Sequence, residues 1–358
     1  MARRVTIKDI ATKAGVSIGA VHCALVGKPG VSEDTRRRIA AIAKECGYRP
    51  NAIASSLKRK AIRIAAAFPG PSNENRFYFS HVWEGIRDYL ASMRDYNIEI
   101  LEYPYYDDFA GQPGVLETIS RQDDIDGVLT LGYMESANRA MLGRFRSQGI
   151  PLVLVGSDIP DSGRLCCVQP DYDVVGRTLA ELLSWQAPGG EILLCAGNVV
   201  TPSHYEIVLG FEAYMAEHHP HVAVQKVHDA GGLDKLCHSL EEILASRPEM
   251  AACCCVNAKS SVMLGRALEN SGRAGSLPAV GCDVFEENIH YLERGTFTNL
   301  LHKNPYSQAF MAAKCLTEHL VRGTNPPRDI LPVGSEILFR SNLPMLRRGQ
   351  RTLYAVVA

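Results

Sequence analysis

The sequence predicts an α/β protein with a small helical unit at the N-terminus and a larger body of parallel sheets with crossover helices. Apolar residues recur at helical spacing within the first 49 residues, and from Ile62 onward short apolar runs alternate with amphipathic stretches. The 358 residues are 46% hydrophobic and 22% charged, which is typical of globular rather than disordered or fibrous chains. This length is enough for two or three domains.

Charge is distributed unevenly along the chain. Residues 1–63 contain fourteen Lys or Arg and four acidic residues, a net charge of +10, whereas the remaining 295 residues carry −11. A basic head on an acidic body indicates that the head meets a polyanion. A basic face that only contacts solvent is the alternative.

Three short helices are expected in the head. Thr6–Asp9 is a capping-box-like helix start, and Gly15 ends that first helix. Ser17 can cap a second helix and Ser32 a third, which Gly47 stops. The apolar stripes of the three are Ile7, Ile10, Ala11 and Ala14, then Val21, Ala24 and Leu25, then Ile39, Ile42, Ala43 and Cys46. A glycine between the first two helices fits a helix-turn-helix unit.

The start of the second helix is the expected DNA-reading surface. A helix fits the DNA major groove, and its first residues contact base edges. We therefore expect the following residues to face DNA: Ser17, Ile18, Gly19 and His22. Basic residues of the third helix would add attraction that salt weakens: Arg36, Arg37, Arg38 and Lys44.

Residues 50–60 form the next piece, with the sequence Pro-Asn-Ala-Ile-Ala-Ser-Ser-Leu-Lys-Arg-Lys. A helix this short is marginal alone in water, so it would order only with a partner copy and DNA. Ala54 lets two such helices approach closely, and Leu57 suits a wedge between base steps in the minor groove. A flexible basic linker is the alternative.

The body shows the alternation that predicts crossover connections. The strand-like runs are Ile62–Phe68, Ile98–Leu101, Gly127–Leu131, Leu152–Val155, Glu191–Ala196, Val222–Val227, Ala252–Val256 and Ala279–Cys282. The helical stretches are Val82–Met93, Leu116–Arg121, Asn138–Gln148, Val174–Ser184, Tyr205–Glu217 and Ser260–Asn270. Ligands of such sheets bind at the carboxyl ends of the strands.

The head resembles that of the lactose-repressor-type (LacI/GalR family) transcription regulators. Separate motifs match in order: Val5-Thr6-Ile7-Lys8-Asp9-Ile10-Ala11 with Ala14-Gly15-Val16-Ser17, then Val31-Ser32 with Thr35-Arg36, then Gly47-Tyr48-Arg49-Pro50-Asn51. The resemblance implies a homodimer that reads a near-palindromic operator, with Thr6 and Ser17 on phosphates and Leu57 as the hinge wedge. We place Asn51, Ala54 and Lys58 on the same DNA surface.

One position of the head departs from the family. Val21-His22-Cys23 stands where the family commonly has Val-Ser-Arg. A bidentate Arg–guanine contact is worth about 1–3 kcal/mol of discrimination, so the operator sequence cannot be carried over. His22 would contact either a base or a phosphate.

The body resembles the type I periplasmic-binding-protein-like domain of the same regulators. The motifs are Gly149-Ile150-Pro151-Leu152-Val153, Val168-Gln169-Pro170-Asp171 with Gly176, Leu209-Gly210-Phe211 and Val280-Gly281-Cys282-Asp283. The resemblance implies two lobes that divide near 161–163 and 290–300, with a small effector such as a sugar, sugar acid or polyol in the cleft. The implied parts are a DNA-binding headpiece at 1–49, a hinge at 50–61, an effector-binding and dimerisation domain at 62–345, and a tail at 346–358.

The resemblance also implies the pocket residues. Asp283 matches the acid that accepts hydrogen bonds from sugar hydroxyls, with helix capping as the alternative. Phe77, Tyr78 and Phe79 stand where the family often has rings that sandwich the ligand, with core packing as the alternative for at least one. Ser157 and Asp158 close a strand and would add polar contacts or form a simple turn.

Two ligand positions depart from the family. Ile207 stands in place of an Arg, which leaves His204 and Glu206 as the nearest polar substitutes. Lys303 stands where Gln or Asp is common. In a cleft it would favour an anionic or hydroxyl-rich ligand, and the alternative is a surface lysine.

Catalysis, cofactors and metals are not expected. Residues 15–19 formally match a nucleophile elbow but follow a helix instead of a strand, and Lys28 lacks the Ser or Thr of a phosphate loop. Pro220 interrupts the histidines at 218, 219 and 221. Residues 253–255 are three cysteines in a strand-like run, where burial is the default. A redox- or metal-responsive regulator that uses these cysteines, with Cys23 near DNA, is the alternative.

We therefore expect a ligand-responsive, sequence-specific transcription regulator, usually a repressor in this family, of carbohydrate or related small-metabolite genes. It is not expected to be an enzyme. A sugar-binding receptor is the competing class, and the basic head and the lack of an apolar signal core after Met1 argue against it.

No apolar run has the length of a membrane span, and eleven cysteines favour a reducing compartment, so a cytoplasmic location is expected. Residues 347–358 lack leucine heptads, so a homodimer is expected rather than a coiled-coil tetramer.

Overall fold

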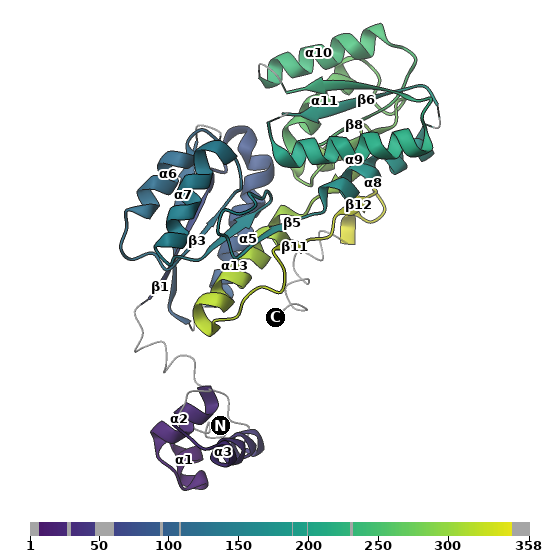
Figure 1. The fold of residues 1–358 in the computed structure, drawn as a ribbon. Coiled ribbons are helices and arrows are strands. Elements are labelled where there is room, and N and C mark those ends of the chain that lie inside the picture. The colour runs from purple at the N-terminus through teal and green to yellow at the C-terminus, as the bar shows by residue number, and fades with distance from the viewer. Residues whose placement is uncertain are drawn as a thin grey trace. The chain divides into compact units, whose positions relative to one another are not determined.

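The computed structural model describes residues 7–26, 30–46, 61–93, 96–106, 109–187, 189–198, 200–229 and 232–345. The chain divides into two compact units, a head within residues 1–61 and a body formed by residues 62–92 and 99–358 (Figure 1). The predicted hinge helix at 50–60 and the tail at 346–358 lie outside the described residues.

The head contains three short helices, α1 (Ile7–Ala14), α2 (Ile18–Val26) and α3 (Glu33–Glu45). Gly15 follows α1 with a φ of 63°, a left-handed conformation that glycine adopts without strain. The side-chain oxygens of Ser17 and Ser32 accept the backbone N–H groups of Ala20 and Thr35 at 3.1 and 3.3 Å, so both serines cap helices as predicted. The buried residues of the head are Ile10, Ala11, Ala14, Val21, Ile39 and Ala43. The predicted helix-turn-helix arrangement is confirmed.

The N-terminal lobe of the body is built on a six-stranded sheet of order β11-β5-β4-β3-β1-β2. Its strands are β1 (Ile62–Pro69), β2 (Ile98–Tyr105), β3 (Gly127–Thr130), β4 (Leu152–Val155), β5 (Cys166–Gln169) and β11 (Ile330–Pro332). The pairs from β11 to β1 are parallel. The helices of this lobe are α5 (Arg76–Ser92), α6 (Gln112–Ser120), α7 (Glu135–Ser147) and α13 (Pro305–Arg322).

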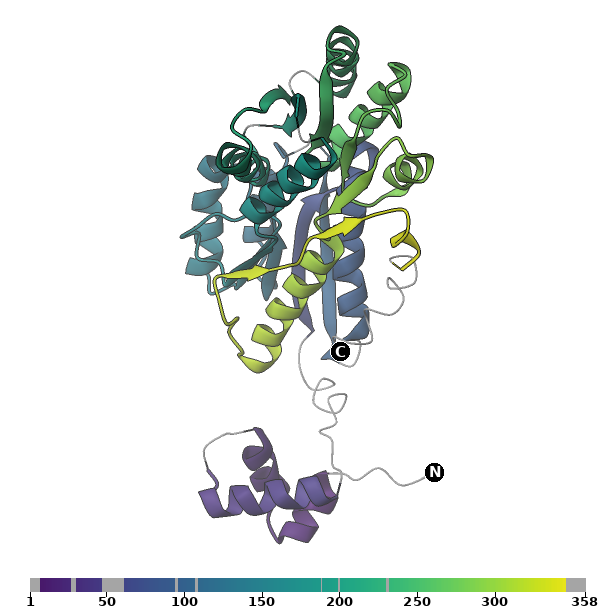
Figure 2. The same cartoon turned by 90° about the vertical axis from the view of Figure 1, so that its right-hand side faces the viewer.

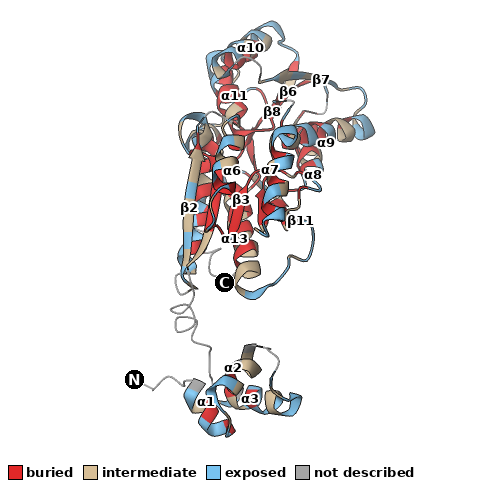
Figure 3. Cartoon of the chain, turned by 60° about the vertical axis from the view of Figure 1, so that its left-hand side comes forward, coloured by how far each residue is buried: buried red, intermediate tan, exposed pale blue. Residues whose placement is uncertain are grey.

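The C-terminal lobe has a second six-stranded sheet of order β12-β10-β9-β8-β6-β7. Its strands are β6 (Glu191–Gly197), β7 (Ala223–His228), β8 (Met250–Cys255), β9 (Ala279–Cys282), β10 (Asn299–His302) and β12 (Glu336–Leu338). β12 pairs with β10 antiparallel, and the other pairs are parallel. The helices are α8 (Tyr172–Gln186), α9 (Pro202–His218), α10 (Leu233–Ser246), α11 (Ala258–Asn270) and α12 (Glu286–Arg294). The central strands of both sheets are largely buried, whereas the edge strands β2 and β7 are mostly half-buried or exposed (Figure 3).

The chain passes between the lobes at 170–171, 303–304 and 333–335, where one sheet ends and an element of the other lobe begins. The third passage is the yellow segment that carries β11 and then β12 in Figure 2. The predicted divisions near 161–163 and 290–300 are therefore wrong. Residues 166–168 still pair with β4, and residues 299–301 still pair with β9, so each sheet gains one short strand before the chain leaves it.

Two glycines allow α8 and α9 to cross closely. A Cβ on Gly176 would lie 2.0 Å from the carbonyl oxygen of Ile207, and one on Gly210 would lie 2.3 Å from that of Asp173. Any larger residue would push the helices apart. This packing explains why glycine stands at two of the positions that carry the family resemblance.

The three consecutive cysteines at 253–255 lie in β8 and are fully buried. Cys253 and Cys255 pack into one core cluster and Cys254 into another, as expected for a strand with a core on each face. Burial raises the pKa of Cys253 to about 12. These thiols are therefore neutral core residues. In the described parts of the body and head, no helix is long and apolar enough to cross a membrane.

Candidate functional site

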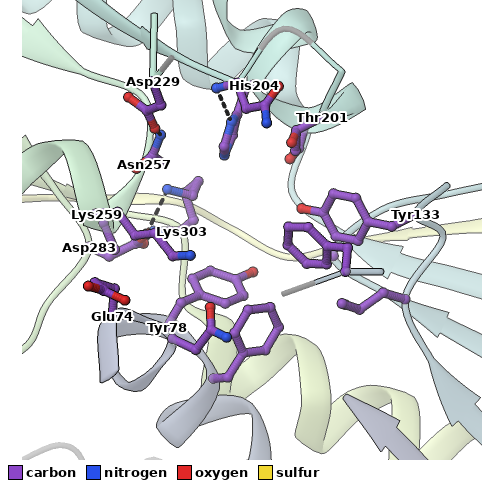
Figure 4. Close-up of a pocket in the computed structure, with 18 of the residues that line it drawn as sticks. Glu74, Tyr78, Tyr133, Thr201, His204, Asp229, Asn257, Lys259, Asp283 and Lys303 are labelled. Atoms are coloured by element: carbon purple, nitrogen blue, oxygen red, sulfur yellow. Dashed lines mark hydrogen bonds and ion pairs between the residues drawn. The ribbon is translucent and has the colours of Figure 1, made fainter. Parts of the chain in front are cut away.

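A cavity of about 380 Å³ lies in the body, lined by strand ends and first helical turns from both lobes (Figure 4). The N-terminal lobe contributes Glu74, Asn75, Tyr78, Phe79, Phe109, Leu131, Tyr133 and Gly156. The C-terminal lobe contributes Tyr172, Asn198, Thr201, Ser203, His204, Asp229, Gly232, Leu233, Asn257, Ala258, Lys259, Asp283 and Lys303. The volume is in the range of about 300–1,000 Å³ found for small-molecule sites, and the carboxyl ends of parallel strands are where such sites form.

A buried ion pair forms the floor of the cavity. Asp283 follows β9 with a φ of 66°, and its carboxylate lies 2.6 Å from the Nζ of Lys303. The same ammonium donates to the Val256 carbonyl at 3.2 Å and contacts the Cys282 sulfur at 2.6 Å. The backbone N–H of Lys303 donates to the other carboxylate oxygen at 3.0 Å. All three protons of the ammonium group therefore have a partner.

Both members of this pair stay charged. Burial alone would raise the pKa of Asp283, but the adjacent Lys303 ammonium, with His302 3.8 Å from the carboxylate, holds that pKa below its usual range. Burial alone would lower the pKa of Lys303, but the Asp283 carboxylate raises it above the usual value. The floor consequently carries two opposite charges that largely cancel.

His204 lines the cavity as a neutral hydrogen-bond donor. Its Nδ1 accepts the backbone N–H of Asn198 at 3.1 Å. Burial, followed by the nearby charge of Lys303, lowers the pKa of His204 to about 3. A neutral ring that accepts at Nδ1 carries its proton on Nε2. A Cβ on Gly197, whose φ is 66°, would lie 2.6 Å from this Nδ1, so the position requires glycine.

Asp229, Asn257 and Ser260 form a polar cluster beside His204. The Asp229 carboxylate accepts the Asn257 amide at 3.0 Å and the Ser260 hydroxyl at 2.8 Å. The Asn257 side-chain oxygen caps α11 by accepting the Ser260 N–H at 2.8 Å. Thr201 and Ser203 are buried, and their hydroxyls form no hydrogen bond to another described residue. This side of the cavity therefore offers hydrogen-bonding groups to a ligand.

Aromatic rings form the opposite side. Phe109 stacks on Tyr133 with ring centres 4.2 Å apart, and the Phe79 ring lies edge-on to Phe109 at 6.4 Å. The Tyr78 ring meets Phe79 edge-on at 5.2 Å. The Tyr78 hydroxyl donates to the Gln308 side chain at 3.3 Å, so mainly its ring is presented to the cavity.

Five of the eight sequence-predicted ligand residues line the cavity: Tyr78, Phe79, His204, Asp283 and Lys303. Three do not. Phe77 is a correction: its ring stacks on Phe285 at 4.7 Å in the core, because α5 begins at Arg76 and successive helix residues point in different directions. Ser157 donates to the Gly132 carbonyl at 3.1 Å, and Asp158 pairs with Arg164, so both stabilise the fold. Glu206 is exposed and does not line the cavity.

The sequence prediction missed polar residues that directly follow strands. Asn198, Asp229 and Asn257 each stand one or two residues after a strand of the C-terminal lobe, and Tyr133 stands three residues after β3. Their sequence signal is a position just after a predicted strand, where the ligands of parallel sheets bind. Phe109, which precedes α6, carries no such signal. Among the described residues, no group of three or more His, Cys, Asp or Glu side chains is placed to hold a metal ion.

The start of α2 is exposed at Ser17, Ile18 and Gly19, with Ile18 at 47%. His22 lies in α2, but its side chain is outside the described part, as are the predicted DNA-contacting residues Thr6, Asn51, Ala54, Leu57 and Lys58. Two of the arginines expected to attract DNA also have structural roles. Arg36 donates to the carbonyls of Cys23 and Ala24, and Arg38 donates to that of Ala14, so both satisfy groups at helix C-termini.

Solved structures with the same fold as the body include one named as a sugar-binding protein and one named as a transcriptional regulator. One is described as GanP, a glucose-galactose binding protein from Geobacillus stearothermophilus, with a TM-score of 0.71, 18% identity, and coverage of 80% of this chain and 100% of that chain. The other is a putative LacI transcriptional regulator from Bacteroides fragilis, with a TM-score of 0.72, 21% identity, and coverage of 80% and 99%. At these identities the likeness concerns the fold alone.

Sequence relatives include proteins named as a catabolite control protein and as an HTH-type transcriptional regulator. The chain is 32% identical over 182 residues to catabolite control protein A of Streptococcus mutans, covering 50% of this chain and 51% of the relative. It is 33% identical over 135 residues to the HTH-type transcriptional regulator RegA of Clostridium saccharobutylicum, covering 37% and 38%. The chain thus spans about half the length, or less, of these curated relatives.

Two family models match separate parts of the chain. Residues 6–51 match the model for bacterial regulatory proteins of the lacI family, and residues 66–324 match the model for a periplasmic binding protein domain. The second match covers most of the body, including both lobes and the cavity. The chain therefore belongs to the periplasmic binding protein domain family, with a lacI-family helix-turn-helix domain at its N-terminus.

Proposed function

We propose that this protein is a homodimeric transcription regulator that binds an operator through its head and a small effector in the cavity of its body. One observation carries the proposal: a cavity with convergent polar groups and a basic helix-turn-helix unit occur in the same chain. A relative named as an HTH-type transcriptional regulator supports the DNA-binding half of the proposal, and a fold neighbour named as a glucose-galactose binding protein supports the effector-binding half.

The head would bind DNA with the exposed start of α2 in the major groove. Ser17, Ile18 and Gly19 lie on that surface, and we assign base contacts to this turn and to His22. Thr6 would contact phosphates. Leu57 would enter the minor groove, supported by Asn51, Ala54 and Lys58 of the hinge. Because residues 1–63 carry a net charge of +10, DNA affinity is expected to fall steeply with salt.

The effector would act through the arrangement of the two lobes. Arg76 of α5 pairs with Glu287 of α12, and Phe77 of α5 stacks on Phe285. These contacts join the N-terminal lobe, which continues from the hinge, to the C-terminal lobe. A ligand that binds the open and closed arrangements unequally shifts their populations. That shift would change how the hinges of a dimer pair and hence operator affinity.

The test is a direct DNA-binding measurement on the full chain. Genomic fragments selected by the purified protein are titrated by fluorescence anisotropy against bulk competitor DNA, with and without fractions of a metabolite extract. We expect specific binding that at least one fraction strengthens or weakens, and we expect a variant that lacks residues 1–60 to lose DNA binding while keeping the effector response in a thermal-shift assay. Equal affinity for every fragment under all conditions would refute the proposal.

A further inference from the structure

Two cysteines of the N-terminal lobe meet between its sheet and α13. Cys166 is the first residue of β5 and is fully buried, and Cys315 lies in α13 and is half-buried. Both are free thiols, and the Cys166 thiol donates a hydrogen bond to the Cys315 sulfur. Neither residue lines the cavity, so the effector site leaves this pair unexplained.

The direction of the Cys166 side chain follows from the alternation of the strands. Leu152 and Leu154 of β4 belong to the core cluster that contains residues of α6 and α7, so Val153 points to the opposite face of the sheet. Cys166 pairs with Val153 and shares that opposite face. Cys167 belongs to the same cluster as Leu152 and Leu154. The adjacent thiols of β5 therefore point away from each other.

α13 covers the face to which Cys166 points, and it runs against the direction of the strands. The helix packs on β3, β4 and β5. A Cβ on Gly156, just after β4, would lie 3.2 Å from the Gln308 side chain, and one on Gly127, the first residue of β3, would lie 3.0 Å from Leu316. The early part of α13 therefore lies over the carboxyl ends of the strands, and its later part lies over their starts.

This register places Cys315 at the level of Cys166. From Gln308 to Cys315 the helix advances seven residues, which is about 10 Å and nearly two full turns, so both residues lie on the face toward the sheet. From Gly156 back to Val153 the strand covers three residues, also about 10 Å. Cys315 thus lies beside the residue that pairs with Val153, which is Cys166.

The two thiols differ in reactivity. The hydrogen bond from Cys166 lowers the pKa of Cys315, and the same contact, together with burial, raises the pKa of Cys166. The thiolate is the nucleophilic form of cysteine. The more exposed Cys315 is therefore the sulfur that a solvent oxidant reaches first, and Cys166 is a second thiol held next to it.

We propose that Cys166 and Cys315 form a redox modification site, in which a hydroperoxide oxidises Cys315 and Cys166 converts the product to a disulfide that links β5 to α13. In a reducing compartment such disulfides are transient and serve as redox sensors. The site is separate from the three buried cysteines at 253–255, which lie in the other lobe.

The chemistry takes place in two balanced steps. The Cys315 thiolate attacks one oxygen of hydrogen peroxide, the S–O bond forms, the O–O bond breaks, and hydroxide leaves, which yields a sulfenic acid. The Cys166 sulfur then attacks the Cys315 sulfur, the S–S bond forms, the S–O bond breaks, and the Cys166 proton leaves with the hydroxide as water. The two sulfurs together lose two electrons, and the two peroxide oxygens gain them.

The position of the pair gives the disulfide a consequence for the lobes. β5 ends just before the passage at 170–171, and α13 begins just after the passage at 303–304. A disulfide ties these two segments together and so restrains any lobe movement that shifts one passage against the other. We expect oxidation to reduce the effect of an effector on operator affinity. This consequence rests on the proposed function, whereas formation of the disulfide does not.

The experiment oxidises the full chain with hydrogen peroxide and identifies the product. Remaining thiols are alkylated, and tryptic peptides are analysed by mass spectrometry without reduction. Trypsin releases Cys315 in the peptide 315–322 and Cys166 in the peptide 165–177, which also contains Cys167. We expect these two peptides to be linked after oxidation and separate after treatment with dithiothreitol.

Variants assign the linked sulfurs. Cys315→Ser and Cys166→Ala are each expected to abolish the linked peptides, and Cys167→Ala, the matched change of the adjacent buried thiol, is expected to keep them. In Cys166→Ala, Cys315 should instead accumulate as a sulfenic acid that dimedone labels, because the second thiol is missing. Melting temperatures check folding, and the half-buried Cys315→Ser keeps the test available if Cys166→Ala does not fold.

Two results would overturn the modification site. One is a linked peptide pair that persists in Cys166→Ala and is lost in Cys167→Ala, which would assign the disulfide to the wrong face of β5. The other is the absence of linked peptides at peroxide concentrations that oxidise Cys46, a half-buried thiol of the head.

The regulatory consequence has its own measurement. Operator affinity is titrated with and without an active metabolite fraction, before and after oxidation. We expect oxidation to reduce the effector response about fivefold or more, dithiothreitol to restore it, and Cys315→Ser to be insensitive to peroxide. A disulfide without a change in the response would overturn the link to the lobes. A disulfide in a protein with no preference for any DNA fragment would support the modification site and refute the regulator.

Discussion

Two aspartates at corresponding strand ends show how differently the lobes use the same chemistry. Asp158 follows β4 in the N-terminal lobe and pairs with Arg164, and Asp283 follows β9 in the C-terminal lobe and pairs with Lys303. Only the second pair borders the cavity, with side chains 1% and 6% exposed. The comparison teaches that a strand-end carboxylate is not by itself a ligand group. Its partner and its position decide whether it supports the fold or the site.

The largest expected effect comes from breaking the Asp283–Lys303 pair. Lys303→Met leaves a buried carboxylate without its partner and should lower the free energy of unfolding by about 3–5 kcal/mol, measured by urea denaturation. Arg164→Met, the matched change in the other lobe, should cost about 1–3 kcal/mol. Effector binding should be lost in the first variant and kept in the second.

A double variant sharpens this result. Asp283→Ala combined with Lys303→Met removes both charges, so the double variant should be destabilised by less than the sum of the two single changes, with a coupling of about 0.5–3 kcal/mol. Additive losses would mean that the two side chains do not act as a pair. Equal losses for Lys303→Met and Arg164→Met would remove the distinction between the lobes.

The second effect concerns the glycine that makes room for His204. Gly197→Ala forces a left-handed alanine, which costs about 1–2 kcal/mol, and places a Cβ 2.6 Å from the His204 ring. We expect a loss of about 2–4 kcal/mol in unfolding free energy and about tenfold weaker effector binding, since the Nε2–H donor moves.

Gly143→Ala in α7 is the matched control, because a Cβ there meets nothing within 4 Å and φ is not positive. In a helix, this change should stabilise the protein by about 0.5–1 kcal/mol. Wild-type effector affinity in Gly197→Ala would show that His204 does not depend on this glycine.

The third effect is that stability depends on pH while effector affinity does not. The folded pKa of His204 is about 3, below the unfolded value of 6.5, so the unfolded state binds more protons between these values. Stability should therefore fall as pH decreases below about 6.5, by about 2–3 kcal/mol from this residue at pH 4.5. His204→Asn keeps an acceptor for the Asn198 N–H but does not titrate, so its stability curve should lack this contribution in urea titrations.

Effector affinity, in contrast, should be nearly constant between about pH 5.5 and 8.5. His204 stays neutral in this range, and Asp283 and Lys303 stay charged, since the pKa of the first is lowered and that of the second is raised. A binding transition near pH 6.5 in calorimetry would show that His204 titrates in the ligand-free protein, against the burial that the structure gives it.

The sequence predicts more of the fold than of the site. Helical spacing and serine caps locate the head helices, and apolar runs locate eight of the body strands, because these patterns are local. The short strands β5, β10, β11 and β12 have three or four residues each and are defined by pairing with distant strands. That pairing is not visible in a local pattern. The predicted lobe boundaries at 161–163 and 290–300 therefore lie before the passages at 170–171 and 303–304.

The site is predicted only where a motif fixes the position. Asp283, Lys303, Tyr78, Phe79 and His204 line the cavity, but whether a polar side chain is already engaged depends on its partner. Nothing near Asp158 in the sequence indicates that Arg164 turns back to it across a loop. Phe109 approaches the cavity because its ring stacks on Tyr133, a contact between residues 24 positions apart. Such contacts are tertiary and have no sequence signature.

The smallest expected effect tests the comparison at two hydroxyls. Ser157→Ala removes the donor to the Gly132 carbonyl, a buried contact at 3.1 Å, and should cost about 1 kcal/mol of stability with effector affinity unchanged. Thr201→Val removes a hydroxyl that has no partner among the described residues and should leave stability within about 0.5 kcal/mol while weakening the effector several-fold. Urea denaturation and calorimetry on both variants measure the two quantities separately. A stability loss only in Ser157→Ala with an affinity loss only in Thr201→Val is the informative result, since a general loss of packing would lower stability and affinity together in either variant. If Ser157→Ala weakens effector binding and Thr201→Val does not, the ligand contacts polar groups of the N-terminal lobe, and the assignment of its hydrogen bonds to the C-terminal lobe is wrong.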